Sequence, residues 1–282
     1  MPESEPQARV CIAHVSDLHF GRIAHPQIVA ALLEEINGCN VDVVAVSGDL
    51  TQRARHHEYR KAAAMLGRME APTLVVPGNH DVYPWWLPFR RIFRPLARYR
   101  RFISDELAPV FERPGLAMLG INSAYGHTVK GGRIDAAARA SIRSFFSTRP
   151  RTDFKVLVVH HHLTRLQALG PHDVARNARR VLDLSSATAV DLILCGHLHV
   201  SHIEPVAIVP ENHRVVIASA GTATSSRGRA SNVRTNFYNR ITVYSDAFEI
   251  EERQFEAESM RFKLHRSMRF LRVSTAKPSV KP

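Results

Sequence analysis

The sequence predicts an α/β fold in which helices cover mixed β-sheets. Short apolar runs alternate with segments of helical spacing through the first two-thirds of the chain. Strand-like segments then follow one another in the last third without helices between them. Alternating strands and helices are typical of sheets with parallel neighbours, and successive strands are typical of antiparallel pairs. Both kinds of pairing are therefore expected.

Six apolar runs have the length of buried strands. They lie at residues 10–16, 41–47, 73–76, 115–122, 155–159 and 191–195. Further strands are expected at residues 215–221, 237–245 and 248–256, the last two as a pair.

Four segments between these runs have helical spacing. They lie at residues 26–37, 56–69, 135–146 and 174–182. In the first of them, the apolar residues fall on one face, with Pro26 suited to the first turn and Gly38 to the exit.

Composition limits the class of protein. The chain has 282 residues, of which 45% are hydrophobic and 23% charged, as is ordinary for one large globular domain. Three cysteines without a CxxC pair predict reduced thiols. No leader-like segment and no span of about 20 apolar residues is found, so we expect a cytoplasmic protein, attached at most to the inner face of the membrane. The net charge of +12 favours anionic partners without choosing among them.

Five of the predicted strands end at side chains that can bind metals. These side chains are Asp17 and His19, then Asp49, then Asn79 with His80, then His160, then His197 with His199. Loops at the carboxyl ends of strands line the ligand crevice of α/β sheets, so these groups are expected to converge.

The types of ligand indicate the metal chemistry. Carboxylate, imidazole and amide donors together suit Mn, Fe, Co or Zn, and the set contains no thiolate of a structural zinc site. The i, i+2 spacing of Asp17 with His19, and of His197 with His199, puts both members of each pair on one face of extended backbone. Gly48, Gly78 and Gly196 precede three of the motifs' ligands and permit close backbone approach.

The motifs SDLH, SGDL, PGNHD, VVHHH and CGHLH resemble those of the calcineurin-like metallophosphoesterase superfamily. Within it, they are most similar to bacterial class III cyclic nucleotide phosphodiesterases. The resemblance implies a four-layer α/β/β/α sandwich with two mixed β-sheets. We place this domain at residues 1–259 and expect residues 260–282 to be a basic, mobile tail.

The resemblance also implies a role for each residue. One metal ion would be held by Asp17, His19, Asp49 and His199. A second would be held by Asp49, Asn79, His160 and His197, with Asp49 bridging. Mn or Fe is the expected metal, with Zn and Co as alternatives. A hydroxide shared by the metals would attack phosphorus, His80 would assist the leaving oxygen, and Asp81 would orient His80.

The triple histidine at residues 160–162 leaves one ligand open. The phosphodiesterases usually have two histidines followed by proline, whereas Leu163 stands here. His160 comes first after the apolar run and best matches the ligand, and His161 is the alternative. We expect His162 to face solvent or substrate.

The segment 83–101 alternates two tryptophans and other apolar residues with six arginines. We weigh a helical cap, with its apolar face packed over the active site, against a surface for an anionic membrane or for a nucleic-acid backbone, on whose bases the aromatic side chains would stack. Pro88 and Pro95 argue against one long helix.

We therefore expect a phosphodiesterase acting on a small phosphodiester, a 3′,5′-cyclic nucleotide such as cAMP. The alternative is a membrane-surface pyrophosphatase acting on a lipid-linked nucleotide such as UDP-diacylglucosamine. A nuclease is disfavoured because we see no added domain that would grip a duplex. A non-catalytic metal scaffold is disfavoured because it would have no use for His80.

Overall fold

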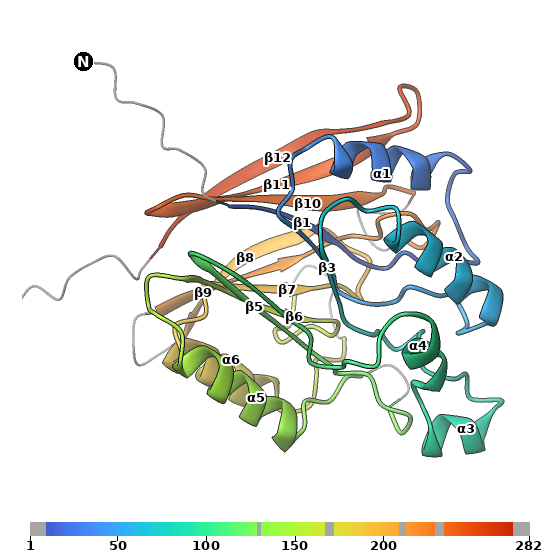
Figure 1. The fold of residues 1–282 in the computed structure, drawn as a ribbon, viewed down its shortest axis with the longest axis horizontal. Helices are drawn as coiled ribbons and strands as arrows, with labels where there is room; N and C mark the ends of the chain where they lie inside the picture. Colours follow the sequence, from blue (N-terminus) through green and yellow to red (C-terminus); the bar gives the residue numbers. More distant parts are fainter. Residues whose placement is uncertain (1–9, 129–130, 167–171, 209–212, 229–233, 273–282) are drawn as a thin grey trace, which may run out of the picture.

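Two six-stranded sheets lie face to face between two layers of helices (Figure 1). The computed structural model describes residues 10–128, 131–166, 172–208, 213–228 and 234–272. The helices are α1 (Ile28–Asn37), α2 (His56–Leu66), α3 (Pro88–Phe93), α4 (Ala97–Phe102), α5 (Ala136–Ser147) and α6 (Ala178–Ala187). The predicted four-layer α/β/β/α sandwich is confirmed.

The first sheet has the strand order β12-β11-β10-β1-β2-β3. Its strands are β1 (Val10–Val15), β2 (Val43–Val46), β3 (Thr73–Val75), β10 (Phe237–Val243), β11 (Ala247–Glu256) and β12 (Arg261–Leu271). β1, β2 and β3 are parallel. The pairs β1–β10, β10–β11 and β11–β12 are antiparallel. The sheet is mixed because helices connect the first three strands and short turns connect the last three.

The second sheet has the order β4-β5-β6-β7-β9-β8. Its strands are β4 (Val110–Arg113), β5 (Leu116–Ile121), β6 (Phe154–Val159), β7 (Leu192–Cys195), β8 (His202–Ile208) and β9 (His213–Ser219). β5, β6, β7 and β9 are parallel, and both edge strands are antiparallel to their neighbours.

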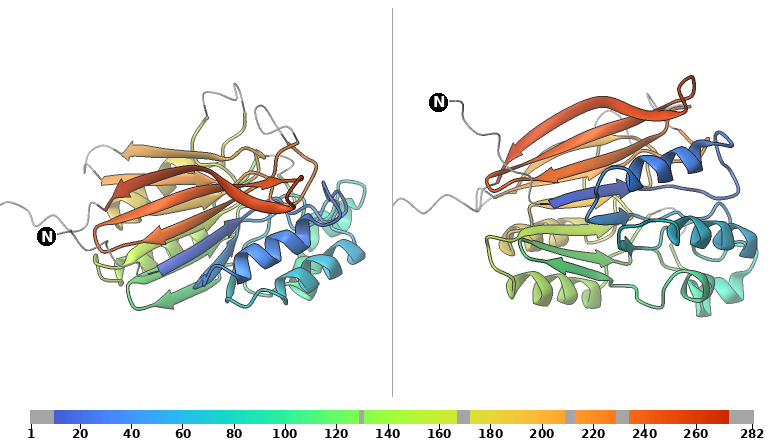
Figure 2. Two further views of the ribbon diagram at one scale, coloured as in Figure 1. Left: turned by 90° about the horizontal axis from the view of Figure 1, so that it is seen from above. Right: turned by 45° about the horizontal axis from the view of Figure 1, so that its top comes forward.

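Three apolar cores hold the four layers together. Alternate residues of β1 and β2 point to opposite faces, so that Ile12 and Val43 lie between the sheets while Ala13 and Val44 face α1 and α2. A third core joins the second sheet to α5 and α6 through Ile142 and neighbouring side chains. Figure 2 shows both helical layers from two further sides.

The boundaries of several elements differ from the prediction. β4 and β8 were not predicted because they are short or polar edge strands. α2 ends at Leu66, before Gly67, rather than at Met69. α6 begins at Ala178 rather than at Val174, after Asn177, which has a left-handed backbone (φ 69°).

The prediction of a mobile tail from Met260 is wrong for residues 261–271. They form β12, which pairs with β11 from Glu256↔Arg261 to Ala247↔Leu271. Phe262 is 3% exposed, and the Glu252 carboxylate accepts a hydrogen bond from Arg266. The segment looked like a tail because four of its 11 residues are arginine or lysine and most of its side chains are exposed, as on an edge strand that avoids further pairing.

Residues 83–101 form two short helices, as the two prolines predicted. α4 is anchored by Tyr99, which is buried and donates a hydrogen bond to the Val75 carbonyl at 2.9 Å. No residue of α3 is buried. The predicted packing of this apolar face over the active site is therefore wrong for α3.

Among the described residues, the model has no helix with the length and apolar character needed to cross a membrane.

The place of β12 in the core can be tested on a single strand. Phe262→Ala should lower the free energy of unfolding by about 3 kcal/mol because it removes a buried aromatic side chain. Leu264→Ala is the matched control, since Leu264 is 53% exposed, and should change stability by less than about 0.5 kcal/mol. Denaturant unfolding measures both. Equal, small effects would mean that β12 is not part of the cooperative core.

Candidate dinuclear metal centre

The predicted ligands converge at one edge of the two sheets. β1 and β2 are parallel neighbours in the first sheet, and β6 and β7 are parallel neighbours in the second. The carboxyl ends of parallel strands meet at the same edge, so the loops that follow these strands face one another. All seven predicted ligands lie in these loops or in the loop after β3.

Four of them form a first cluster: Asp17, His19, Asp49 and His199. The Nε2 atom of His19 lies 3.5 Å from Asp17 Oδ1 and 3.6 Å from Asp49 Oδ2. The Nε2 atom of His199 lies 3.5 Å from Asp17 Oδ1. Ligand atoms at about 2.1 Å from a shared tetrahedral ion lie roughly 3.4 Å apart. The spacing therefore suits a common ion better than direct hydrogen bonds.

The buried polar atoms of this cluster support the same fit. Asp17 Oδ1, His19 Nε2 and Asp49 Oδ2 are buried and have no hydrogen-bond partner among the described residues. A buried polar atom without a partner carries a large desolvation penalty. A divalent cation would satisfy all three atoms at once.

A second cluster lies beside the first. The Asn79 side-chain oxygen is 3.1 Å from His160 Nε2 and 2.9 Å from His197 Nδ1. Asp49 Oδ1 is 3.4 Å from the same His160 nitrogen. These four groups are the predicted second set, and they meet around one point.

Asp49 stands between the clusters. Its Oδ2 faces His19 and the first cluster, whereas its Oδ1 faces His160 and the second. Burial opposes its ionised form, but His160 and His80 hold the pKa of this carboxyl well below its ordinary value. A charged carboxylate with an oxygen toward each cluster is the geometry of a bridging ligand.

Backbone carbonyls orient the imidazoles of three ligands. His19 Nδ1 contacts the Thr51 carbonyl, His160 Nδ1 the Ser47 carbonyl and His199 Nδ1 the Arg227 carbonyl. A carbonyl only accepts, so each Nδ1 must carry the proton and each Nε2 must offer its lone pair.

Burial keeps two of the ligand rings neutral. It lowers the pKa of His19 to about 4 and that of His197 to about 3. Burial also opposes protonation of His160, but the nearby Asp49 raises the pKa of that ring to about 9. A metal at the second cluster would therefore displace a proton from His160.

The chain reaches this geometry through unusual backbone angles. Five ligands have left-handed φ values: Asp17 (53°), His19 (44°), Asp49 (55°), His197 (72°) and His199 (58°). This region is uncommon for residues other than glycine and marks functional sites. At Gly78, an added Cβ would collide with the Asp49 carboxylate and backbone, so only glycine permits the close approach of the two loops.

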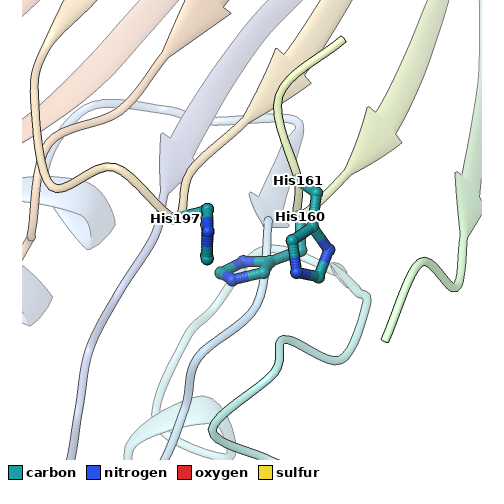
Figure 3. Close-up of side chains that lie close together, drawn as sticks. All are labelled: His160, His161 and His197. Carbon is teal, nitrogen blue, oxygen red and sulfur yellow. The ribbon is translucent and has the colours of Figure 1, made fainter. Parts of the chain in front are cut away.

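The three consecutive histidines point to different partners. Figure 3 shows His160 and His161 together after β6, facing His197. The nitrogens of these three rings lie within 4.8 Å of one another. His160 also contacts Asp49 and Asn79, whereas His161 Nδ1 lies 2.8 Å from the Ser123 hydroxyl and its buried Nε2 has no hydrogen-bond partner. His160 therefore fits the four-donor cluster, and His161, whose unpartnered Nε2 belongs to the same group of ring nitrogens, stays the alternative ligand.

His162 does not face solvent or substrate, so that prediction is wrong. Its ring is fully buried, with Nε2 at 3.1 Å from the Ser219 hydroxyl. Strand alternation turns it away from His161 and toward β9.

His80 lies at the edge of the cavity, but Asp81 does not orient it. The His80 Nδ1 atom donates to the Gln52 carbonyl at 2.8 Å. The Asp81 carboxylate instead accepts hydrogen bonds from the backbone N–H groups of Leu50, Thr51 and Gly78. Asp81 thus ties together the loops after β2 and β3, and the predicted orienting role is corrected.

Arg227 is a site residue that the sequence analysis missed. Its guanidinium lies 2.8 Å from His80 Nε2, and its carbonyl orients His199. It lines a cavity of about 510 Å³ together with Asp49, Asn79 and His80. Arg227 lies in the loop after β9, which is parallel to β7, so the strand-end rule that found the other residues could have found it.

Several curated relatives match the chain, and two of them are phosphodiesterases by name. A glycerophosphodiester phosphodiesterase from Enterobacter lignolyticus is 28% identical over 203 residues, 67% of this chain and 70% of the relative. A 3′,5′-cyclic adenosine monophosphate phosphodiesterase from Haemophilus influenzae is 27% identical over 175 residues, 60% of each protein.

Solved structures share the fold. A purple acid phosphatase from yellow lupin seeds superposes with a TM-score of 0.69 at 12% identity, covering 93% of this chain and 54% of that one. A dimetal phosphatase from Danio rerio gives a TM-score of 0.66 at 12% identity, covering 94% of this chain and all (100%) of that one.

The family model of calcineurin-like phosphoesterases matches residues 11–201, which include every predicted ligand. With this match and the convergent ligand geometry, the chain belongs to the calcineurin-like phosphoesterase family.

Proposed function

We propose that the protein is a dinuclear metal-dependent phosphodiesterase acting on a small phosphodiester, a 3′,5′-cyclic nucleotide such as cAMP. The dinuclear site is proposed because the two carboxylate oxygens of Asp49 face two separate clusters of ligand atoms. Family membership supports hydrolysis of a phosphoric ester. The cyclic nucleotide is supported by the relative whose name specifies cyclic adenosine monophosphate.

The two metal sites would be divided as follows. Asp17, His19, Asp49 and His199 would hold one ion, and Asp49, Asn79, His160 and His197 the other. The mixed oxygen and nitrogen donors favour Mn or Fe, with Zn and Co as alternatives. Such a pair supplies Lewis acidity and lowers the pKa of water, giving a bridging hydroxide as nucleophile.

His80 would serve the leaving group. The Gln52 carbonyl fixes Nδ1–H, so Nε2 is the nitrogen directed toward Arg227 and the cavity. Nε2 accepts from Arg227 while that contact is made, so it would first have to take up a proton from solvent after the substrate draws Arg227 away, and this proton would then pass to the leaving oxygen as the P–O bond breaks. His80 also donates its backbone N–H to Asp49 Oδ1 at 2.8 Å, so the ring stays beside the bridging carboxylate.

Arg227 would bind the phosphoryl oxygens. It is half-buried and lines the cavity, and burial lowers the pKa of its guanidinium without neutralising it at pH 7. Its hydrogen bond to a nitrogen lone pair of His80 can be exchanged for two hydrogen bonds to a phosphodiester, which are stronger because both partners are charged.

A second candidate is hydrolysis of a lipid-linked nucleotide such as UDP-diacylglucosamine at a membrane surface. It is supported by Trp85, which lines the mouth of the cavity and is 73% exposed.

A cytoplasmic location, including the inner face of the membrane, is supported by the three free cysteines.

The Mn-loaded protein should hydrolyse bis-p-nitrophenyl phosphate and cAMP, and Asp49→Asn should lose both activities by at least about a hundredfold. The variant should also bind fewer than two metals, because one substitution weakens both sites. Metal analysis and product assays measure these effects, with Asp183→Asn on α6 as a matched surface control. Turnover of a UDP-linked lipid but not of cAMP would favour the second candidate. Two metals retained in Asp49→Asn would exclude the bridging role.

His80→Ala should keep its metals and show a loss that depends on the leaving group. Hydrolysis of cAMP, which expels an alkoxide, should fall by about 10²–10⁴ because the alkoxide needs a proton. Hydrolysis of bis-p-nitrophenyl phosphate should fall much less, because nitrophenolate leaves unaided. Equal losses on both substrates would show that His80 does not act as the acid.

Arg227→Ala should lower kcat/KM for bis-p-nitrophenyl phosphate by about a hundredfold, the effect of removing a charged hydrogen bond from the site. The metal content should not change, since His199 is held by the backbone carbonyl of residue 227. Arg22→Ala is the control, because Arg22 is exposed and the one side-chain hydrogen bond described for it goes to the Ser226 hydroxyl. An unchanged kcat/KM would remove Arg227 from the substrate site.

A further inference from the structure

The surface around α3 exposes large apolar side chains to solvent. Trp85, Trp86, Phe89, Ile92 and Phe93 are exposed by 73, 45, 77, 64 and 76%, and they make up most of the large exposed hydrophobic side chains of the described residues. We call these five residues the apolar rim. In an ordinary amphipathic helix such side chains face the core and charged ones face water.

Here a charged side chain takes the inner position. The Arg91 guanidinium donates to the Tyr83 carbonyl and, at 2.6 Å, to the Thr128 carbonyl. These bonds fasten α3 to two loops while Phe89 and Phe93 stay outside. The apolar rim is therefore held out by defined polar anchors, and contiguous exposed apolar surface of this kind marks an interaction site.

The segment that carries the apolar rim is basic. Between Val82 and Ser104 the sequence contains six arginines and no acidic residue. Arg90 and Arg94 are exposed beside the rim, and the Arg53 guanidinium lies 5.8 Å from the Trp86 ring. Aromatic side chains interleaved with arginines suit the interface of an anionic bilayer, where apolar burial and attraction to acidic headgroups act together.

The position of the rim also favours a bilayer over a flat protein partner. α3 lies at a corner of the molecule, away from both sheets (Figure 1). A protruding corner enters a deformable headgroup layer easily but presents little area to a protein, whose stable interfaces need about 800 Å² from each partner.

We propose that the apolar rim docks the enzyme on anionic membranes, with the mouth of the catalytic cavity facing the headgroup layer. Pro84, Trp85 and Arg91 line that cavity, so the rim and the mouth are continuous. The orientation rests on the proposed function, since it places phosphodiesters of the membrane surface next to Arg227 and His80. The docking itself does not depend on turnover.

The chain carries its own reporter of this contact. Trp85 and Trp86 are its only two tryptophans, so tryptophan fluorescence, excited selectively, reports on the rim alone. Vesicles of phosphatidylglycerol and phosphatidylcholine should shift the emission to the blue and carry the protein into the pellet. Pure phosphatidylcholine vesicles should do so at least about tenfold less, and salt at about 0.5 M should reverse the effect.

Matched variants distinguish vesicle binding through the apolar rim from nonspecific adsorption of the protein. Phe89→Ser/Phe93→Ser should lower the vesicle partition coefficient at least about tenfold. Leu264→Ser/Leu271→Ser removes two exposed apolar side chains from β12 and should leave it unchanged. Arg90→Gln/Arg94→Gln should weaken binding, whereas Arg143→Gln/Arg180→Gln, with the same change in net charge, should not.

Hydrolysis of the soluble bis-p-nitrophenyl phosphate should be equal in all four variants, because none of these side chains lines the cavity. If the soluble diester is not hydrolysed but vesicles bind, the proposed function fails and the docking stands. The docking proposal is overturned if the Phe89→Ser/Phe93→Ser variant binds vesicles like wild type, or if no vesicle binds. It is also overturned if the blue shift follows protein concentration without vesicles, which identifies a second copy, or follows added DNA instead.

Discussion

The position of the Asp49 carboxylate is the constraint on which the site depends. One oxygen must face each ligand cluster, so the loop after β2 must approach the loops after β1, β3, β6 and β7 at close range. Two features permit this approach. Asp49 adopts a left-handed backbone, and Gly78 leaves room against it where any Cβ would collide. The strain is local, and the surrounding sheets hold it in place.

A buried polar layer beneath the ligands supplies that support. Asp17 Oδ2 accepts hydrogen bonds from the Ser16 hydroxyl at 2.7 Å and the His197 N–H at 2.9 Å, which leaves Oδ1 free to face the first cluster. The Thr222 hydroxyl donates to the Asp17 carbonyl at 2.7 Å and joins the last part of the chain to the first motif. Asp81 joins the loops after β2 and β3 in the same way. Such contacts set ligand orientation and are part of the site as much as the ligands are.

The metal-binding groups lie in the interior of the site, whereas the arginines lie closer to its surface. The interior of the site collects carboxylates and imidazoles, a donor set that suits cations. The cavity wall and the apolar rim carry arginines, which attract anions. A phosphodiester approaching the cavity therefore meets a basic surface first and the metal-binding floor last, and both steps lower its energy.

The sequence by itself determined the succession of most strands and helices along the chain. It also determined the donor types and the sequence positions of all seven ligand candidates. This was possible because coordinating side chains must follow the ends of strands, so the chemistry is written in short local strings such as GNHD and GHLH. The sequence left both His160 and His161 as ligand candidates. The structure favours His160, because it places this ring near Asp49 and Asn79.

The tertiary structure decided the contacts between loops that are far apart in the chain. Gln52, rather than Asp81, fixes the His80 ring, and Arg227 reaches His80 across 147 positions of sequence. β12 became a strand because β11 offers it an edge, although its own composition resembles a tail. The apolar residues of α3 have a helical pattern, but no neighbouring layer covers them. Local pattern encodes which side chains are available, whereas burial and partnership depend on what the rest of the fold brings against them.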